Sequence, residues 1–148
     1  LGFEDDNGFN HEQELIILNL VSMDKSNFDM NQVLTLLKNL DAKYVNGFFS
    51  HRDLSGKEVF RIASGINPGL LDAETETHIL LIALDLYQAN DPVKAFEIML
   101  ESASSISEKL HASICDSARV PLSKQMIEHL KSKAQEISHL NSIKNISA

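Results

Sequence analysis

The sequence is poor in the features that define several protein classes. Its one cysteine, Cys115, excludes an internal disulfide, and no signal peptide is visible. No apolar run approaches the roughly 18 residues that a membrane-spanning helix requires. Basic residues are few, 13 against 21 acidic ones, so the net charge of −8 argues against nucleic acid or an anionic membrane surface as the main partner. We therefore expect an ordinary globular domain without a disulfide framework.

Motifs of enzymes are also scarce. Residues 51–54, His-Arg-Asp-Leu, match the start of the catalytic loop of protein kinases, but Glu58 stands where that loop needs asparagine, and no glycine-rich phosphate loop occurs. The six histidines lack metal-ligand spacing. Cys115 is interpreted as a small buried hydrophobe, and Asp116 and Arg119 as a structural pair at a turn. The sequence thus predicts no catalytic residue, no metal site and no cofactor, and we expect the protein not to be an enzyme.

What the chain does contain is enough apolar sequence for one core. Apolar residues make up 43% of the 148 residues and charged residues 23%, as in a single globular domain. The stretch His78–Tyr87 is almost entirely apolar and ends at an Asn-Asp-Pro turn, which favours a strand. Because strand side chains alternate, this strand has two faces, and both are apolar in the middle.

The remaining elements follow from caps and periodicity. Asp29, Asp91 and Ser123 are expected to cap three amphipathic helices, with Gln32 completing a capping box for the first and Pro92 opening the second. The core is predicted to contain Leu34, Leu37, Phe60, Ile62, Ile82, Leu84, Phe96, Met99 and Leu130. Strands are predicted at residues 15–20, 44–51, 57–64, 78–87 and 113–115, with a further short one at 119–122.

This order predicts an α+β domain of two layers, in which a largely antiparallel sheet of about six strands is packed on one side by three helices. We expect residues 1–13 to be a flexible leader or linker remnant, residues 14–140 to form the domain, and residues 141–148 to be a frayed tail.

The sheet face away from the helices is predicted to be apolar, although such a face is usually polar. Asn19, Arg61 and Asp85 mark outward positions, and of the neighbours Phe48 and Phe49 we place Phe49 outward. This face then gathers two glycines and six apolar residues: Gly47, Gly65, Leu15, Ile17, Phe49, Ala63, Leu81 and Ala83. An exposed apolar patch usually marks a binding groove. Alternatively, a short strand, the leader or a crossing loop covers this face.

Several local motifs in this order carry a family resemblance. They are Leu-Ile-Ile-Leu-Asn-Leu at 15–20, His-Arg at 51–52, Phe-Arg-Ile-Ala at 60–63, Asn-Pro-Gly at 67–69, Phe-Glu-Ile-Met-Leu-Glu-Ser-Ala at 96–103, and the region 115–123. Together they resemble the FtsZ-binding C-terminal domain of the bacterial cell-division protein ZipA. The resemblance runs from about residue 14 to about residue 138 and rests on the ordered set of motifs.

The resemblance implies a six-stranded sheet on three helices, whose open face is a shallow apolar groove for the C-terminal tail peptide of FtsZ. Family members carry an N-terminal membrane helix and a long linker, and tether FtsZ filaments to the cytoplasmic face of the inner membrane at the division site. The domain itself is expected to be monomeric. Carried over position by position, the peptide-binding residues are Leu15, Ile17, Gly47, Phe49, Ala63, Gly65, Asn67, Leu81 and Ala83.

A second hypothesis comes from a different class. The apolar face would pair with another copy of the chain, or with the acidic leader, which carries Phe3 and Phe9. Family members often have large residues at the positions of Gly47, Gly65 and Ala83, and a basic residue in place of Asn67. The resemblance therefore implies the fold and the partner but leaves the affinity open.

Overall fold

The structure, a computed structural model, describes residues 13–147. The predicted leader 1–13 therefore lies almost wholly outside the described residues. Over the described part, strands and helices follow in the order β1 (Leu15–Ser22), α1 (Met30–Asn39), β2 (Ala42–Val45), β3 (Phe48–Arg52), β4 (Glu58–Ser64), β5 (Ile79–Asp85), α2 (Pro92–Leu110), β6 (Ala112–Cys115) and α3 (Lys124–Ser147).

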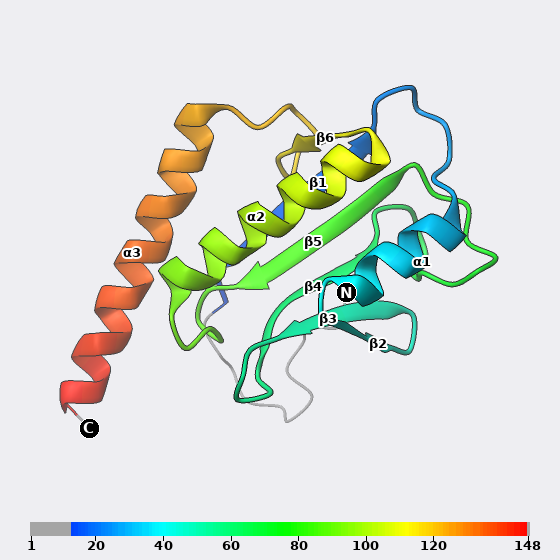
Figure 1. Cartoon of the computed structure of the whole chain (residues 1–148). Helices are drawn as coiled ribbons and strands as arrows, with labels where there is room; N and C mark the ends of the chain where they lie inside the picture. The colour runs from blue at the N-terminus through cyan, green and yellow to red at the C-terminus, as the bar shows by residue number, and fades with distance from the viewer. Residues whose placement is uncertain (1–12, 148) are drawn as a thin grey trace.

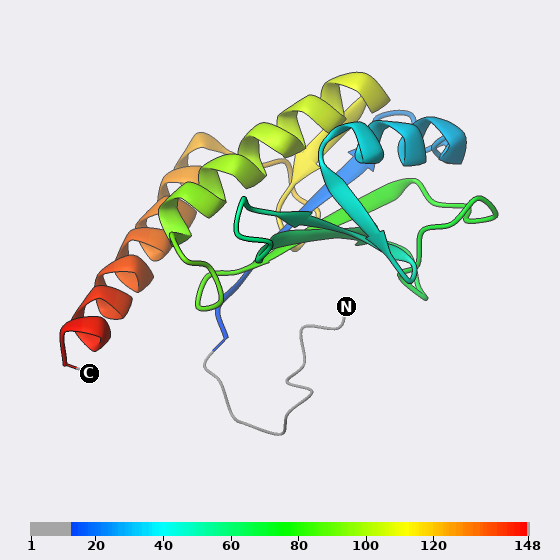
Figure 2. The same cartoon turned by 60° about the horizontal axis from the view of Figure 1, so that its bottom comes forward.

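The six strands form one sheet in the order β2-β3-β4-β5-β1-β6, and all neighbouring strands run antiparallel (Figure 1). The apolar strand β5 lies in the middle, between β4 and β1. Figure 2 shows α1 and α2 along one face of the sheet, and α3 packs beside α2. The predicted α+β fold of sheet and three helices is confirmed.

The helices begin where the sequence predicts. The Asp29 carboxylate accepts a hydrogen bond from the N–H of Asn31 at 3.0 Å, and that of Asp91 accepts from the N–H of Lys94 at 3.1 Å. The Ser123 hydroxyl accepts from the N–H of the third residue beyond it, also at 3.1 Å. Such caps satisfy backbone donors that have no partner within the helix.

The core lies between the sheet and the helices. Seven of the nine predicted core residues are buried, whereas Leu34 and Leu130 are partly buried and pack against the core. The largest fully buried side chains are Phe49, Phe60, Phe96, Ile16, Leu18, Leu20, Leu37, Ile62, Leu71, Ile79, Leu80 and Ile82.

Two element predictions need correction. The predicted strand 44–51 is two strands, β2 and β3, joined by a turn at Asn46 and Gly47. The predicted strand 119–122 is a single bridge between Cys115 and Pro121. Helix α3 extends to Ser147, and the fraying of residues 141–148 stays a prediction. Gln32 does not complete the predicted capping box in the described contacts, because its side-chain amide donates to the Lys109 carbonyl at 3.3 Å.

Candidate functional site

The sheet face opposite α1 and α2, which we call the outer face, carries side chains from neighbouring strands in register. Ile17 of β1 lies beside Ala83 of β5, which lies beside Arg61 of β4. Two residues along β5, Leu81 lies beside Ala63 of β4. No described helix lies on this side of the sheet (Figure 2).

A groove of about 370 Å³ is hollowed into the outer face where β3, β4 and β5 meet the segment 66–70. Ala63, only 2% exposed, lies at its floor, and Leu70, 48% exposed, stands at its rim. Phe48 and Leu81 are partly buried. The complete lining, which we call the groove, is Phe48, Ala63, Ser64, Gly65, Ile66, Asn67, Pro68, Gly69, Leu70 and Leu81. The lining combines apolar side chains with the polar Ser64 and Asn67, as in many ligand-binding pockets.

The predicted outward placement of Phe49 is wrong. Phe49 is fully buried in the core and pairs in register with the core residue Ile62. Because strand side chains alternate, its neighbours Phe48 and Ser50 face outward. Ser50 accordingly pairs with Arg61, and the Arg61 guanidinium lies 4.6 Å from the centre of the Phe48 ring. The groove therefore has Phe48 where the sequence places Phe49.

Gly47 lies in the turn between β2 and β3 and is not part of the groove lining. Asn46 and Gly47, with φ of 48° and 100°, join β2 to β3, and Asn-Gly favours such a turn because both residues need positive φ. A Cβ added to Gly47 would lie 2.6 Å from Cδ2 of Leu70. The Gly47 carbonyl accepts from the N–H of Leu71 at 2.6 Å. Gly47 thus allows the rim residue Leu70 to pack against the hairpin.

Gly65 connects the groove to a distant loop. A Cβ on Gly65 would lie 2.5 Å from Cγ2 of Ile79, so the strands approach closely here. The Gly65 carbonyl accepts a hydrogen bond from the Arg119 guanidinium at 3.0 Å. Arg119 has φ of 64° and lies in the turn after β6, where its N–H donates to the Asp116 carbonyl at 2.9 Å. The predicted structural pairing of these two residues exists through the backbone, while the Arg119 side chain reaches a groove residue.

The predicted peptide-binding residues divide into groups. Four of them line the groove: Ala63, Gly65, Asn67 and Leu81. Three more occupy outward positions on β1 and β5 outside the groove lining: Leu15, Ile17 and Ala83. Leu15 is 37% exposed, whereas Ala83 is fully buried. The contact of any of these residues with a peptide stays a prediction.

Sequence reasoning missed Phe48, Leu70 and Arg119. The Asn-Gly pair at 46–47 is typical of a hairpin turn, and it predicts two strands in place of the single strand 44–51. In the second of these strands, the polar Ser50 would then have indicated that Phe48 faces outward. Leu70 and Arg119 lie in irregular segments, where no periodicity indicates the direction of a side chain.

Two titratable groups near the sheet have shifted pKa values. Burial, followed by the negative charge of Asp116, raises the pKa of the Cys115 thiol, which makes it a poor nucleophile. Hydrogen bonds, first from the Ser55 hydroxyl, lower the pKa of Asp53 in the β3–β4 turn.

Within residues 13–147, no three His, Cys, Asp or Glu side chains are grouped to hold a metal ion. In the same part of the chain, no helix has the length and apolar character needed to cross a membrane.

Comparison with known proteins gives consistent matches. The family model described as ZipA, C-terminal FtsZ-binding domain, matches residues 14–133. Cell division protein ZipA of Colwellia psychrerythraea is 29% identical over 140 residues, which cover 89% of this chain and 37% of that protein. ZipA of Shewanella baltica is 29% identical over 119 residues, 74% of this chain and 33% of that protein, and ZipA of Stutzerimonas stutzeri is 24% identical over 132 residues, 84% and 48%.

The chain therefore spans between about a third and a half of the length of these relatives. Since the family match extends from residue 14 to residue 133 of the 148 and the fold agrees with it, this chain belongs to the family of ZipA C-terminal FtsZ-binding domains.

Proposed function

We propose that this domain is a non-enzymatic cell-division adaptor that binds the C-terminal tail peptide of FtsZ in the groove of the outer face. The observation that carries the proposal is the groove itself, which presents Phe48, Leu70 and Leu81 on the sheet face that the described helices leave uncovered in a domain of an FtsZ-binding family. In the intact protein, an N-terminal membrane anchor would place the domain at the cytoplasmic face of the inner membrane and tether the Z ring there.

Apolar side chains supply most of the binding energy in this proposal. Phe48, Leu70 and Leu81 offer the large partly exposed surfaces, and Ala63 leaves depth between them. Burying a whole apolar side chain contributes about 1.5–3 kcal/mol, and interface energy concentrates in a few such anchors. A tail that becomes ordered on binding loses conformational entropy, so the net affinity is expected in the micromolar range.

Two matched leucine variants test the proposal. Leu70 and Leu54 are both exposed leucines of loops, but only Leu70 lines the groove, whereas Leu54 stands at the tip of the β3–β4 hairpin at 108% exposure. Fluorescence anisotropy with a labelled FtsZ tail measures the Kd of each variant. Leu70→Ala should weaken binding about fivefold, equivalent to about 1 kcal/mol, and Leu54→Ala should leave it unchanged.

The same titration separates the proposal from self-association. If the wild-type chain does not bind the tail, or if both leucine variants bind like wild type, the groove is not the FtsZ site. Failure to bind the tail together with dimerisation in sedimentation experiments would instead support an apolar face that pairs with a second copy.

A further inference from the structure

A polar row crosses the outer face next to the groove. Lys43 of β2 pairs in register with Ser50 of β3, which pairs with Arg61 of β4. Ser50 and Arg61 face outward with Phe48, and Lys43, opposite Ser50, shares their face. The row adjoins the groove because Phe48, which lines the groove, also lies against the Arg61 guanidinium.

The middle residue of this row has an unused hydrogen-bonding group. Ser50 is fully buried, and its hydroxyl has no hydrogen-bond partner in the described structure. Most buried polar groups are paired, because a hydroxyl that loses water without gaining a partner destabilises the fold. An orphaned hydroxyl beneath a binding face is the arrangement expected of a site whose partner is a ligand.

The hydrogen-bond donors around this hydroxyl indicate the chemical class of the ligand. Lys43 is exposed, and Arg61, whose side chain is 19% exposed, pairs with the Glu58 carboxylate. Hydroxyl, ammonium and guanidinium groups are all donors, so the complementary group is an anionic acceptor.

We propose that Lys43, Ser50 and Arg61 form a subsite for a carboxylate side chain of the peptide that occupies the groove. This inference rests on the proposed function. An apolar anchor of the peptide would lie against Phe48 in the groove, and the carboxylate would lie two residues along β3, roughly 6.6 Å away, over Ser50. There it accepts from the Ser50 hydroxyl and the Lys43 ammonium and shares the Arg61 guanidinium with Glu58.

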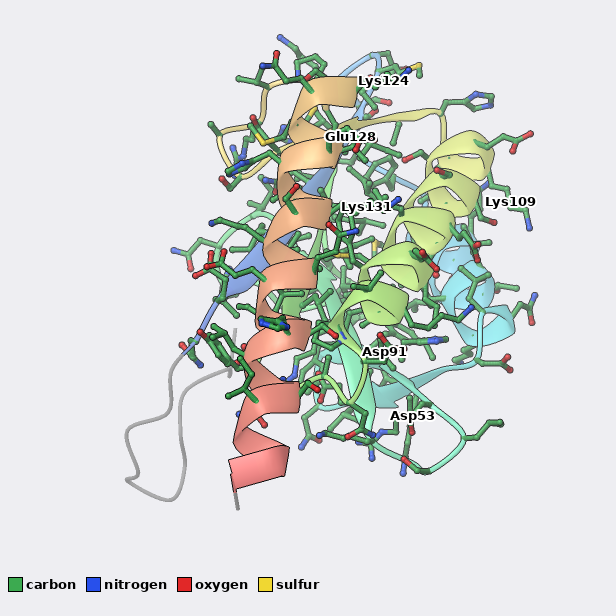
Figure 3. The ribbon with its side chains drawn as sticks, turned by 90° about the vertical axis from the view of Figure 1, so that its left-hand side faces the viewer. Asp53, Asp91, Lys109, Lys124, Glu128 and Lys131 are labelled. Atoms are coloured by element: carbon green, nitrogen blue, oxygen red, sulfur yellow. The ribbon has the colours of Figure 1, made fainter. Side chains whose placement is uncertain are left out.

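The test combines three protein variants with two peptides. Ser50→Ala removes the hydroxyl, and Lys43→Gln removes one charge from the row. Lys109→Gln is the matched control, because Lys109 is also exposed but lies on α2, in the helical layer (Figure 3). Each protein is titrated by fluorescence anisotropy with the FtsZ tail and with the same tail in which every Asp and Glu is changed to Asn or Gln.

We expect Ser50→Ala to weaken binding of the acidic tail about five- to tenfold and Lys43→Gln about two- to fivefold, whereas Lys109→Gln binds like wild type. The amide-substituted tail should bind wild type about tenfold more weakly, and the Ser50 and Lys43 variants should no longer affect it. Ser50→Ala should melt at or above the wild-type temperature, because no hydrogen bond is lost in the free protein.

Each outcome decides the inference. Equal binding of the two tails to wild type, or equal losses by the variants with both tails, would overturn the carboxylate subsite while leaving the groove intact as an FtsZ site. If wild type binds neither tail, the proposed function and this inference fail together. A coupled loss, seen only with the acidic tail, supports the subsite.

Discussion

At the scale of single residues, two neighbouring phenylalanines have opposite roles. Phe49 lies in the core at 0% exposure, and Phe48 lines the groove. We expect Phe49→Ala to lower the free energy of unfolding by about 3–5 kcal/mol, as for other buried phenylalanines. Phe48→Ala should leave the urea midpoint nearly unchanged but weaken binding of the FtsZ tail about tenfold, or about 1.4 kcal/mol.

Each phenylalanine variant is the control for the other. Urea melts and tail titrations are made on both. Equal losses of unfolding free energy would mean that the two side chains are equally buried, and tail binding by Phe48→Ala as tight as that of wild type would exclude Phe48 from the site.

Asp24 supplies a prediction about pH. Hydrogen bonds from the Ser26 hydroxyl and N–H, and from the Ser22 hydroxyl, lower the pKa of Asp24 to about 2. Since the pKa is lower in the folded state, these bonds stabilise the turn fully above the ordinary aspartate range near pH 4, and that contribution disappears as the pH falls toward 2. Carboxyl-carbon NMR should give a midpoint near pH 2 for Asp24.

Ser26→Ala removes the largest of these hydrogen bonds and is the matched variant. Its Asp24 carboxyl should titrate at a higher pH than in wild type. A wild-type midpoint near pH 4 would show that the turn does not hold the carboxylate in solution.

At the scale of elements, β5 shows how one strand serves both faces. Ile82 is fully buried against the helices, while its neighbour Leu81 lines the groove. Ile82→Ala should cost about 2–5 kcal/mol of folding stability. Leu81→Ala should cost much less in urea melts but should weaken the tail complex. Equal losses of stability at the two positions would mean that the outer face is as closely covered as the core.

The β2–β3 turn links backbone conformation to the groove. Gly47 and Gly56 both have positive φ, at 100° and 85°, but only Gly47 has a close neighbour, Leu70. Gly56→Ala should therefore cost about 1–2 kcal/mol for the conformation alone. Gly47→Ala should cost more and should also weaken tail binding, because the added methyl group displaces Leu70. Thermal melts and titrations of both variants measure these effects, and identical behaviour would contradict the role assigned to Leu70.

At the scale of the whole molecule, we expect a monomer that binds one tail peptide. The chain has a mass of 16.5 kDa and a net charge of −8, which opposes self-association. Sedimentation velocity should give one species of that mass, and titration with the tail should saturate at one peptide per chain. A dimer that dissociates on addition of the tail would show instead that the outer face pairs two copies.

The sequence alone determined the parts of the fold that depend on neighbouring residues. Caps such as Asp91 and Ser123 act within one turn of helix, and the apolar periodicity of α1 and α2 follows from local spacing, so the helices and the α+β class were predictable. The ordered motifs also identified the family, which the match over residues 14–133 confirms.

The tertiary structure decided which side chains form the groove. The orientation of Phe48 is set by the register of β3 with β4, and a shift of one residue would exchange the faces of the whole strand. Arg119 reaches the Gly65 carbonyl from 54 residues away, and Leu70 approaches through an irregular segment. Such contacts depend on where distant segments meet in space, so the local periodicity of the sequence does not predict them.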